Sequence, residues 1–352
     1  MSSTATEHLL PGVPAEALTV PPSVKGEPAG ERGGWRRETA RPADPGTAAG
    51  PAHPPPGRWT TTLLRRLDSI PAPLFLLVGM GTVQTGIALS TPLFGPLGVA
   101  GTTFLRLLIA SAVLLTATRP RLRGRSPRDL VSAVLLGAAS AGMTLLFAGA
   151  VDRLPMGTAA TIEFLGPLAV ALVLARGLGH VLWAVLAAAG VALLTLVGSG
   201  HGGGLDPAGL VCAFGAAACY AGYILLTHRV GAAFRGLEGL AVSVTVGAVL
   251  LAPIGLAPVW HGLATGPHPW ALLLRAAGVA MLLPVIPYAL DLTALRRLPQ
   301  RVFSVVVSME PAVSAVVGLV VLGQRIGPAQ ALGIACVITA SAGATLTGRD
   351  RG

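Results

Sequence analysis

Long apolar stretches separated by short polar connections make up most of the sequence between about residue 70 and residue 348. A helix needs roughly 20 apolar residues to cross a bilayer, and ten stretches come close to this length. They lie near residues 72–94, 97–118, 129–150, 156–175, 181–199, 207–227, 237–258, 270–292, 302–322 and 328–347. This pattern predicts an all-α integral membrane protein with ten transmembrane helices.

Residues 1–66 show neither apolar periodicity nor the continuous apolar core of a signal peptide. They are rich in Pro, Gly, Ala, Glu and Arg, a composition typical of disordered segments. We expect a disordered cytoplasmic tail there, with a start-site extension as the alternative interpretation. Thr60–Ile70 is expected to form a short interfacial helix before the first membrane span.

The arginines between the apolar stretches predict the orientation, because cytoplasmic flanks retain Lys and Arg. With the N-terminus inside, the cytoplasmic side receives the cluster between Arg119 and Arg128 and the turn between Arg296 and Arg301. The outer side keeps only Arg153 and Arg325. The sequence therefore predicts a multi-pass protein of the plasma or inner membrane with both termini in the cytoplasm.

One motif occurs twice in the chain, which indicates an internal duplication. The Arg-Leu-Pro sequence that begins at Arg153 recurs at Arg297, and Pro167 aligns with Pro311 at the same shift of 144 residues (311 minus 167). The first repeat is expected at residues 70–200 and the second at residues 205–348.

Each of the two repeats would contain five transmembrane helices. Because five is an odd number, the second repeat must enter the membrane in the opposite sense to the first. Inverted repeats of this kind are used by many secondary transporters, which bind substrate near the membrane midplane between the halves. The predicted fold therefore favours transport over the other classes considered, an intramembrane enzyme or a non-transporting scaffold.

Charged residues within the predicted helices are few: Arg106, Glu163, Arg275 and Glu310. A charge inside the bilayer costs about 2.5–3.5 kcal/mol on insertion scales, so such residues usually have a function or a partner. Glu163 and Glu310 lie about seven and eight residues into helices that enter from opposite faces, which puts both roughly 10–12 Å deep. We expect both carboxylates at one central site, with Arg106 as its cation.

Prolines follow both acids closely. Pro167 and Pro311 each lack a backbone donor and free the carbonyl one turn earlier, that of Glu163 and of Val307. Freed carbonyls beside a cavity are useful polar ligands. The prolines are therefore predicted to break these helices at the substrate site.

Polar residues elsewhere in the helices are weaker candidates. Gln84 in the first predicted helix and Tyr288 in the eighth are candidates for the same site, or else for hydrogen bonds between helices. For the charges, the alternative is that arginines and glutamates only neutralise each other. Arg275 lies near the outer end of its helix, so we expect its guanidinium to reach the membrane interface. The glycines and alanines of segment 215–222 are expected to serve helix packing alone.

The composition excludes several other kinds of protein. Hydrophobic residues make up 53% of the chain and charged residues 11%, with a mean hydropathy of +0.71, unlike a soluble domain. The net charge of +10 comes with only 5% aromatic residues and short arginine clusters between apolar stretches, so no nucleic-acid partner is expected. The three cysteines lack zinc-like spacing, and the HGGG sequence at His201 has no accompanying GxSxG motif. We expect neither a metal, a cofactor nor an enzymatic activity.

Four stretches carry a resemblance to a known family: VQTG at 83–86, LRLLIA at 105–110, IEFLGPLAVAL at 162–172, and the long segment 286–324. They resemble the EamA, or drug/metabolite transporter, superfamily, and within it the threonine/homoserine exporter branch. The resemblance covers about residues 70–348 and implies a ten-helix carrier that exports small amino acids. Gln324 departs from the pattern, because many members of the superfamily have an acidic residue after the Leu-Gly pair.

The charges and the resemblance together lead to a hypothesis of proton antiport with alternating access. Glu163 or Glu310 would bind the ammonium of an amino acid, Arg106 would bind its carboxylate, and one acid would exchange substrate for a proton. The expected partners are an amino acid, protons and the lipid bilayer, and a homodimer is compatible with the sequence. The alternative is an EamA-type exporter of another metabolite or a cationic drug, in which Arg106 is structural.

Overall fold

The computed structural model describes residues 72–120, 126–174, 179–197, 205–234, 238–266, 268–287, 290 and 300–347. These residues all belong to one compact unit of the chain, residues 57–352. The expected tail at residues 1–66, the interfacial helix at Thr60–Ile70 and Tyr288 lie outside the described residues.

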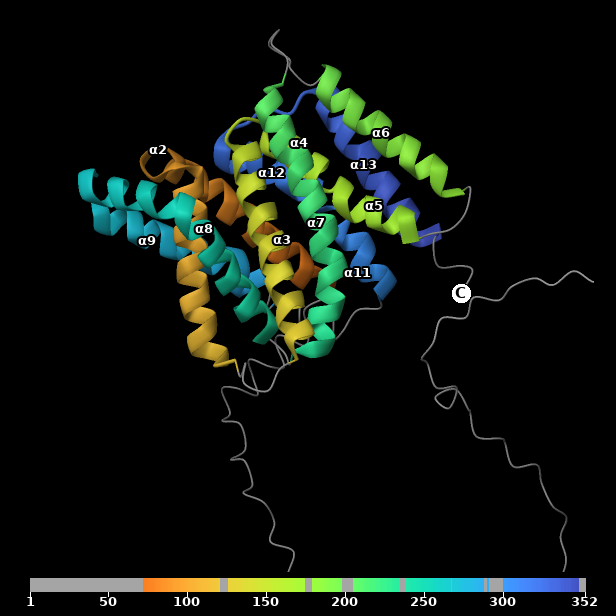
Figure 1. The fold of residues 1–352 in the computed structure, drawn as a ribbon. Helices are drawn as coiled ribbons and strands as arrows, with labels where there is room; N and C mark the ends of the chain where they lie inside the picture. The colour runs from red at the N-terminus through yellow and green to blue at the C-terminus, as the bar shows by residue number, and fades with distance from the viewer. Residues whose placement is uncertain are drawn as a thin grey trace, which may run out of the picture. The chain divides into compact units, whose positions relative to one another are not determined.

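The described part of the chain is helical and contains no strand (Figure 1). Its elements are α2 (Ala72–Thr118), α3 (Pro127–Val151), α4 (Met156–Glu163), α5 (Leu165–Leu174), α6 (Gly179–Val197), α7 (Pro207–Ala233), α8 (Glu238–Thr265), α9 (Pro269–Ala280), the π-helix η2 (Met281–Val285), α11 (Gln300–Val307), α12 (Glu310–Leu322) and α13 (Pro328–Thr347).

Seven helical segments among the described residues are long and apolar enough to cross a membrane, judged by length and composition. Two further apolar helices, Val181–Thr195 and Pro269–Leu283, are shorter. The prediction of an all-helical protein with several membrane-spanning helices is confirmed. Seven is fewer than the ten helices expected, partly because one segment, Pro73–Thr118, is 46 residues long and covers two of them.

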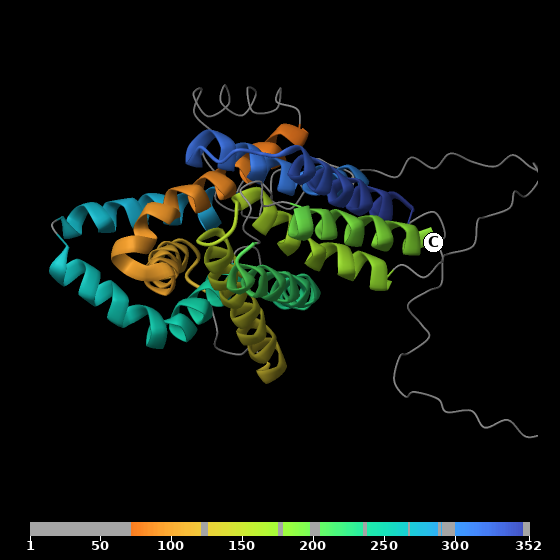
Figure 2. The ribbon, with the colours of Figure 1, turned by 90° about the horizontal axis from the view of Figure 1, so that it is seen from above.

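The long helix α2 changes direction at a glycine. Gly98 has a φ of 67° and a ψ of 165°, which are not helical angles, and the positive φ is one that glycine adopts without a steric cost. Pro92 and Pro96 precede it within the helix. In Figure 2, one part of α2 lies in the plane of the picture and the other part is seen end-on. The gap predicted between residues 94 and 97 therefore corresponds to this bend.

Two of the predicted membrane helices are interrupted in the middle. The stretch predicted at 156–175 consists of α4 and α5, which are separated at Phe164. The stretch predicted at 302–322 consists of α11 and α12, which are separated at Ser308 and Met309. A proline follows each interruption and supplies no N–H for the carbonyl one turn earlier, which accounts for the local loss of helix geometry.

Helices from the two halves of the chain pack against each other. α2 packs on α8, α3 on α7, α4 on α12, and α6 on α13. At the α6–α13 crossing, a Cβ placed on Gly190 would lie 2.8 Å from the backbone oxygen of Gly333, and a Cβ on Gly333 would lie 2.8 Å from that of Gly190. Small residues of this kind let the backbones of membrane helices approach closely.

The first turn of α4 is hydrogen-bonded to side chains from the C-terminal half of the chain. The Met156 N–H donates to Oε1 of Gln324 at 2.9 Å, and Oγ of Ser314 donates to the Met156 carbonyl at 3.2 Å. Nε2 of Gln330 donates to Oγ1 of Thr158 at 2.8 Å. Since the first N–H groups of a helix have no partner within the helix, these bonds satisfy buried polar groups and fix this end of α4.

Candidate substrate-binding cavity

A cavity of about 390 Å³ lies among helices from both halves of the chain. Its walls come from α2, α3, α4, α7, α8, η2, α11 and α12. This volume falls within the range of roughly 300–1,000 Å³ that is typical of small-molecule sites. Most of the lining is apolar, with a small number of charged and hydroxyl-bearing side chains.

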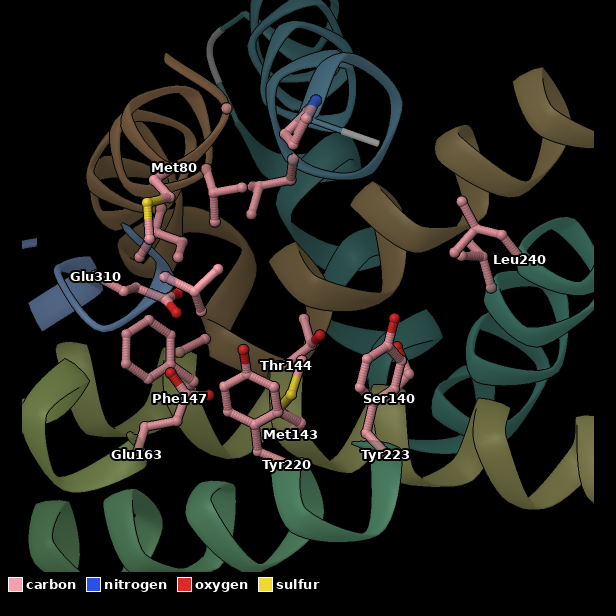
Figure 3. A pocket seen from close by; sticks show the side chains of 18 of the residues that line it. Met80, Ser140, Met143, Thr144, Phe147, Glu163, Tyr220, Tyr223, Leu240 and Glu310 are labelled. Atoms are coloured by element: carbon pink, nitrogen blue, oxygen red, sulfur yellow. The ribbon is translucent and has the colours of Figure 1, made fainter. Parts of the chain in front are cut away.

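Three of the residues predicted from the sequence line this cavity: Arg106, Glu163 and Glu310. Glu163 is the last residue of α4 and Glu310 the first residue of α12, so each acid lies beside a helix interruption. Figure 3 shows their carboxyl groups reaching the same part of the cavity from two different helices. The two carboxylates are close enough for their charges to repel each other.

Arg106 is a buried cation in the wall of the cavity, with 5% of its surface exposed. Within the described residues, the salt bridges join Arg153 to Asp152 at 3.4 Å and to Asp206 at 3.6 Å, and no ion pair joins Arg106 to an acid. An isolated buried charge is costly unless a partner compensates it. The cavity wall therefore offers an anion-binding group that no acid in the described part of the chain neutralises.

The remaining predicted residues that the structure describes do not line the cavity. Gln84 is 1% exposed, and its Oε1 has no hydrogen-bond partner among the described residues. Pro167 and Pro311 lie beside the helix interruptions, outside the lining, although Val307 does contribute to it. Arg275 is exposed.

Sequence reasoning missed the hydroxyl-bearing side chains on two walls of the cavity: Ser140 and Thr144 on α3, and Tyr220 and Tyr223 on α7. The two tyrosine rings have centroids 6.3 Å apart and are inclined at 58°. Tyr220 lies within segment 215–222, whose glycines and alanines were expected to serve packing. A signal was present, since two of the chain's three tyrosines lie three residues apart, a spacing that puts both on one helix face.

Comparison with known sequences identifies relatives over most of the chain. The model of the EamA-like transporter family matches residues 207–346. Threonine/homoserine exporter RhtA of Escherichia coli (strain K12) is 37% identical over 283 residues, which cover 78% of this chain and 92% of the exporter. RhtA of Salmonella typhimurium (strain LT2) is 37% identical over 279 residues, covering 78% and 91%. A probable terminal-alkyne amino-acid exporter of Streptantibioticus cattleyicolor is 32% identical over 257 residues, covering 68% and 83%.

A solved structure is similar in fold. It matches with a TM-score of 0.51 and 20% sequence identity, covering 79% of this chain and 98% of its own. Identity at this level supports the helical architecture alone. The two RhtA exporters go further, because they share more than a third of their residues with this chain over nearly their whole length. The chain is a multi-pass membrane protein and belongs to the EamA-like transporter family.

Proposed function

We propose that the protein exports small amino acids, such as threonine and homoserine, from the cytoplasm and binds them in the cavity described above. Relatives named as amino-acid exporters support the substrate class. The observation that carries the proposal is the cavity lining, which combines two carboxylates with a buried guanidinium that has no acidic partner among the described residues.

The lining complements the two charges of an amino acid. The guanidinium of Arg106 is suited to a substrate carboxylate, since a guanidinium presents paired donors to two carboxylate oxygens. Glu163 and Glu310 are suited to the substrate ammonium. A cationic drug would use the two acids but would leave Arg106 buried beside a second cation, which favours a zwitterionic substrate.

The two neighbouring acids support proton antiport. Two carboxylates that repel each other are more stable when a substrate ammonium or a proton reduces their combined charge. Exchange of the ammonium for an incoming proton would couple export to the proton-motive force. Entry of one proton across 100 mV releases about 2.3 kcal/mol, and about 1.4 kcal/mol corresponds to a tenfold gradient.

We further propose ten membrane helices arranged as two inverted repeats, residues 70–200 and 205–348. The interruptions after Glu163 and after Val307 support this, because these residues are separated by the same 144 positions as the two prolines. The helix contacts support it as well. In the proposed repeats, α3 is equivalent to α9 with η2, and α7 is equivalent to α2. The contact of α3 with α7 therefore has a counterpart in the contact of α2 with α9 and η2.

Alternating access is supported by the position of the cavity within the predicted topology. Leu76, Leu240 and Phe303 line it and lie near the helix ends predicted to be cytoplasmic. At the predicted outer side, Leu154 and Met156 are buried in one apolar cluster. This arrangement is the one expected of an inward-facing state with both termini in the cytoplasm.

The decisive experiment is counterflow of radiolabelled threonine in proteoliposomes with Arg106→Gln. Loss of a charge-assisted contact worth about 1.5–3 kcal/mol should weaken threonine binding about 10- to 150-fold. Competition by an amine without a carboxylate should stay unchanged. Arg275→Gln is the matched control, because this arginine is exposed and lies outside the cavity.

Unchanged threonine affinity in Arg106→Gln would refute the assignment of Arg106. If the wild-type protein instead carries carboxylate-free cations better than threonine, the alternative function, export of a cationic drug or metabolite, would replace the proposed one.

A further inference from the structure

Ser140 and Thr144 differ from the other hydroxyl-bearing residues near them. Ser132, on the same helix, donates its hydroxyl to the carbonyl of Arg128 at 2.9 Å. Thr227 on α7 bonds the carbonyl of Tyr223 at 2.7 Å in the same way. Ser140 and Thr144 line the cavity, and their hydroxyls make no hydrogen bond within the part of the chain that the structure describes.

The missing backbone bond has a consequence for binding. Serine and threonine in helices commonly satisfy their hydroxyls by bonding the carbonyl four residues earlier. A hydroxyl that faces a cavity without such a bond keeps its donor and acceptor capacity for water or for a ligand. Ser140 and Thr144 are four residues apart, so they lie on one face of α3 at about 5–6 Å between Cβ atoms. They form a short polar strip on an otherwise apolar wall.

The polar strip lies on a part of the cavity separate from the acids. Figure 3 shows Thr144 and Ser140 on α3 close to Tyr220 and Tyr223 on α7, with both acids to one side. A substrate whose ammonium is held at the acids can therefore extend its side chain along α3. Met143 also lines this region and supplies apolar surface for the carbon atoms of that side chain.

We propose that Thr144 and Ser140 form the side-chain subsite of the cavity and bind a hydroxyl on the substrate. The subsite selects hydroxylated amino acids over apolar ones of the same shape. Valine, for example, has a methyl group where threonine has its hydroxyl, so bound valine would remove water from Thr144 and offer no bond in return. Sites that hydrogen-bond a substrate hydroxyl discriminate far more strongly than apolar pockets do. This inference rests on the proposed export of amino acids.

The test compares matched substrate pairs in proteoliposomes that contain the full-length protein in their membrane. Radiolabelled threonine counterflow is competed with threonine or valine, and radiolabelled homoserine counterflow with homoserine or norvaline. We expect the wild-type protein to prefer the hydroxylated member of each pair. In Thr144→Val, loss of one hydrogen bond of about 0.5–1.5 kcal/mol should reduce the threonine-to-valine preference about 2- to 12-fold. Ser140→Ala should reduce the preference for at least one of the two pairs.

Ser132→Ala and Thr227→Val are the matched controls, because their hydroxyls bond backbone carbonyls and lie outside the cavity lining. Thr144→Ser keeps a hydroxyl at the same position and should keep the wild-type preference, which makes it informative even if Thr144→Val does not insert.

The outcomes separate this inference from the proposal on which it rests. If Thr144→Val and Ser140→Ala both transport threonine with the wild-type preference over valine, the subsite is refuted and amino-acid export stands. A loss of preference in Thr144→Ser equal to that in Thr144→Val would also refute it. If the wild-type protein transports neither threonine nor homoserine, the proposed function and the subsite both fail.

Discussion

The two interrupted helices, α4–α5 and α11–α12, are built alike but hold their acids differently. α4 ends at Glu163 and α11 at Val307, and each is followed four residues later by a proline. In the first half of the chain the acid is the last residue before the interruption. In the second half, Glu310 is the first residue of α12, after the interruption. One type of helix break thus presents a carboxylate from opposite helix ends.

This difference alters the electrostatics of the two acids. The N-terminal end of a helix carries a partial positive charge and the C-terminal end a partial negative charge. The field of α12 therefore favours the negative charge of Glu310, whereas the field of α4 opposes that of Glu163. Glu163 is also the more deeply buried, at 8% exposed. We expect Glu310 to bind the substrate ammonium and Glu163 to exchange the proton.

The largest expected effect comes from exchanging each acid for its amide. Glu310→Gln removes the charge that binds the ammonium, so threonine affinity and coupled flux should fall about 100-fold, as for loss of a charge-assisted contact. Glu163→Gln should keep counterflow at equal pH near the wild-type rate but lose its acceleration by a pH gradient. Both are measured with radiolabelled threonine in inside-out vesicles after insertion is checked.

Equal losses of threonine flux in the two variants would show that the two acids do not have separate roles in substrate binding and proton exchange. Unchanged coupled flux in Glu310→Gln would remove Glu310 from the mechanism.

A smaller effect is expected from the prolines. Pro311→Ala restores a backbone donor for the Val307 carbonyl and allows α11 and α12 to join, which would shift Glu310. We expect threonine flux to fall about fivefold, equivalent to about 1 kcal/mol of lost interaction. Pro253→Ala is the control, because this proline lies within α8 and outside the cavity lining. A wild-type rate in Pro311→Ala would mean that the interruption does not position the acid.

The smallest effect concerns the other end of α4, where Gln324 accepts the Met156 N–H. Gln324→Leu leaves this buried donor without a partner and should destabilise the protein by about 1–3 kcal/mol. Gln324→Glu keeps an acceptor for the Met156 N–H and should lose less stability. Thermal unfolding in detergent measures both variants. Equal melting temperatures in Gln324→Leu and the wild type would show that α4 is held by packing alone.

Much of the fold could be predicted from the sequence because membrane spans have a simple physical signature. Apolar stretches of helix length indicated the membrane helices, and the expected boundaries lie close to the ends of α3, α6 and α13. The charges at Arg106, Glu163 and Glu310 stood out because each is costly in a bilayer. The structure brings all three to one cavity. The assignment of roles to them stays a prediction.

The rest of the site could not be read in this way. Gln84 was a candidate for the site because it is a polar residue within a predicted helix, but it is buried outside the cavity lining. The hydroxyls of Ser140 and Thr144 cost little in a helix, because a backbone carbonyl can usually satisfy them. Only the structure distinguishes these two from Ser132, whose hydroxyl does bond its own backbone.

The sequence alone determined the membrane class, the positions of the buried charges and the repeated proline pattern. These follow from local chemistry, since the cost of a charge or the absence of an N–H depends on the residue and its immediate neighbours. Tertiary structure decided which helix faces enclose the cavity and which helix end carries each acid. Packing between α3 and α7, and between α4 and α12, joins residues far apart in the chain, and no local pattern specifies which of their faces meet.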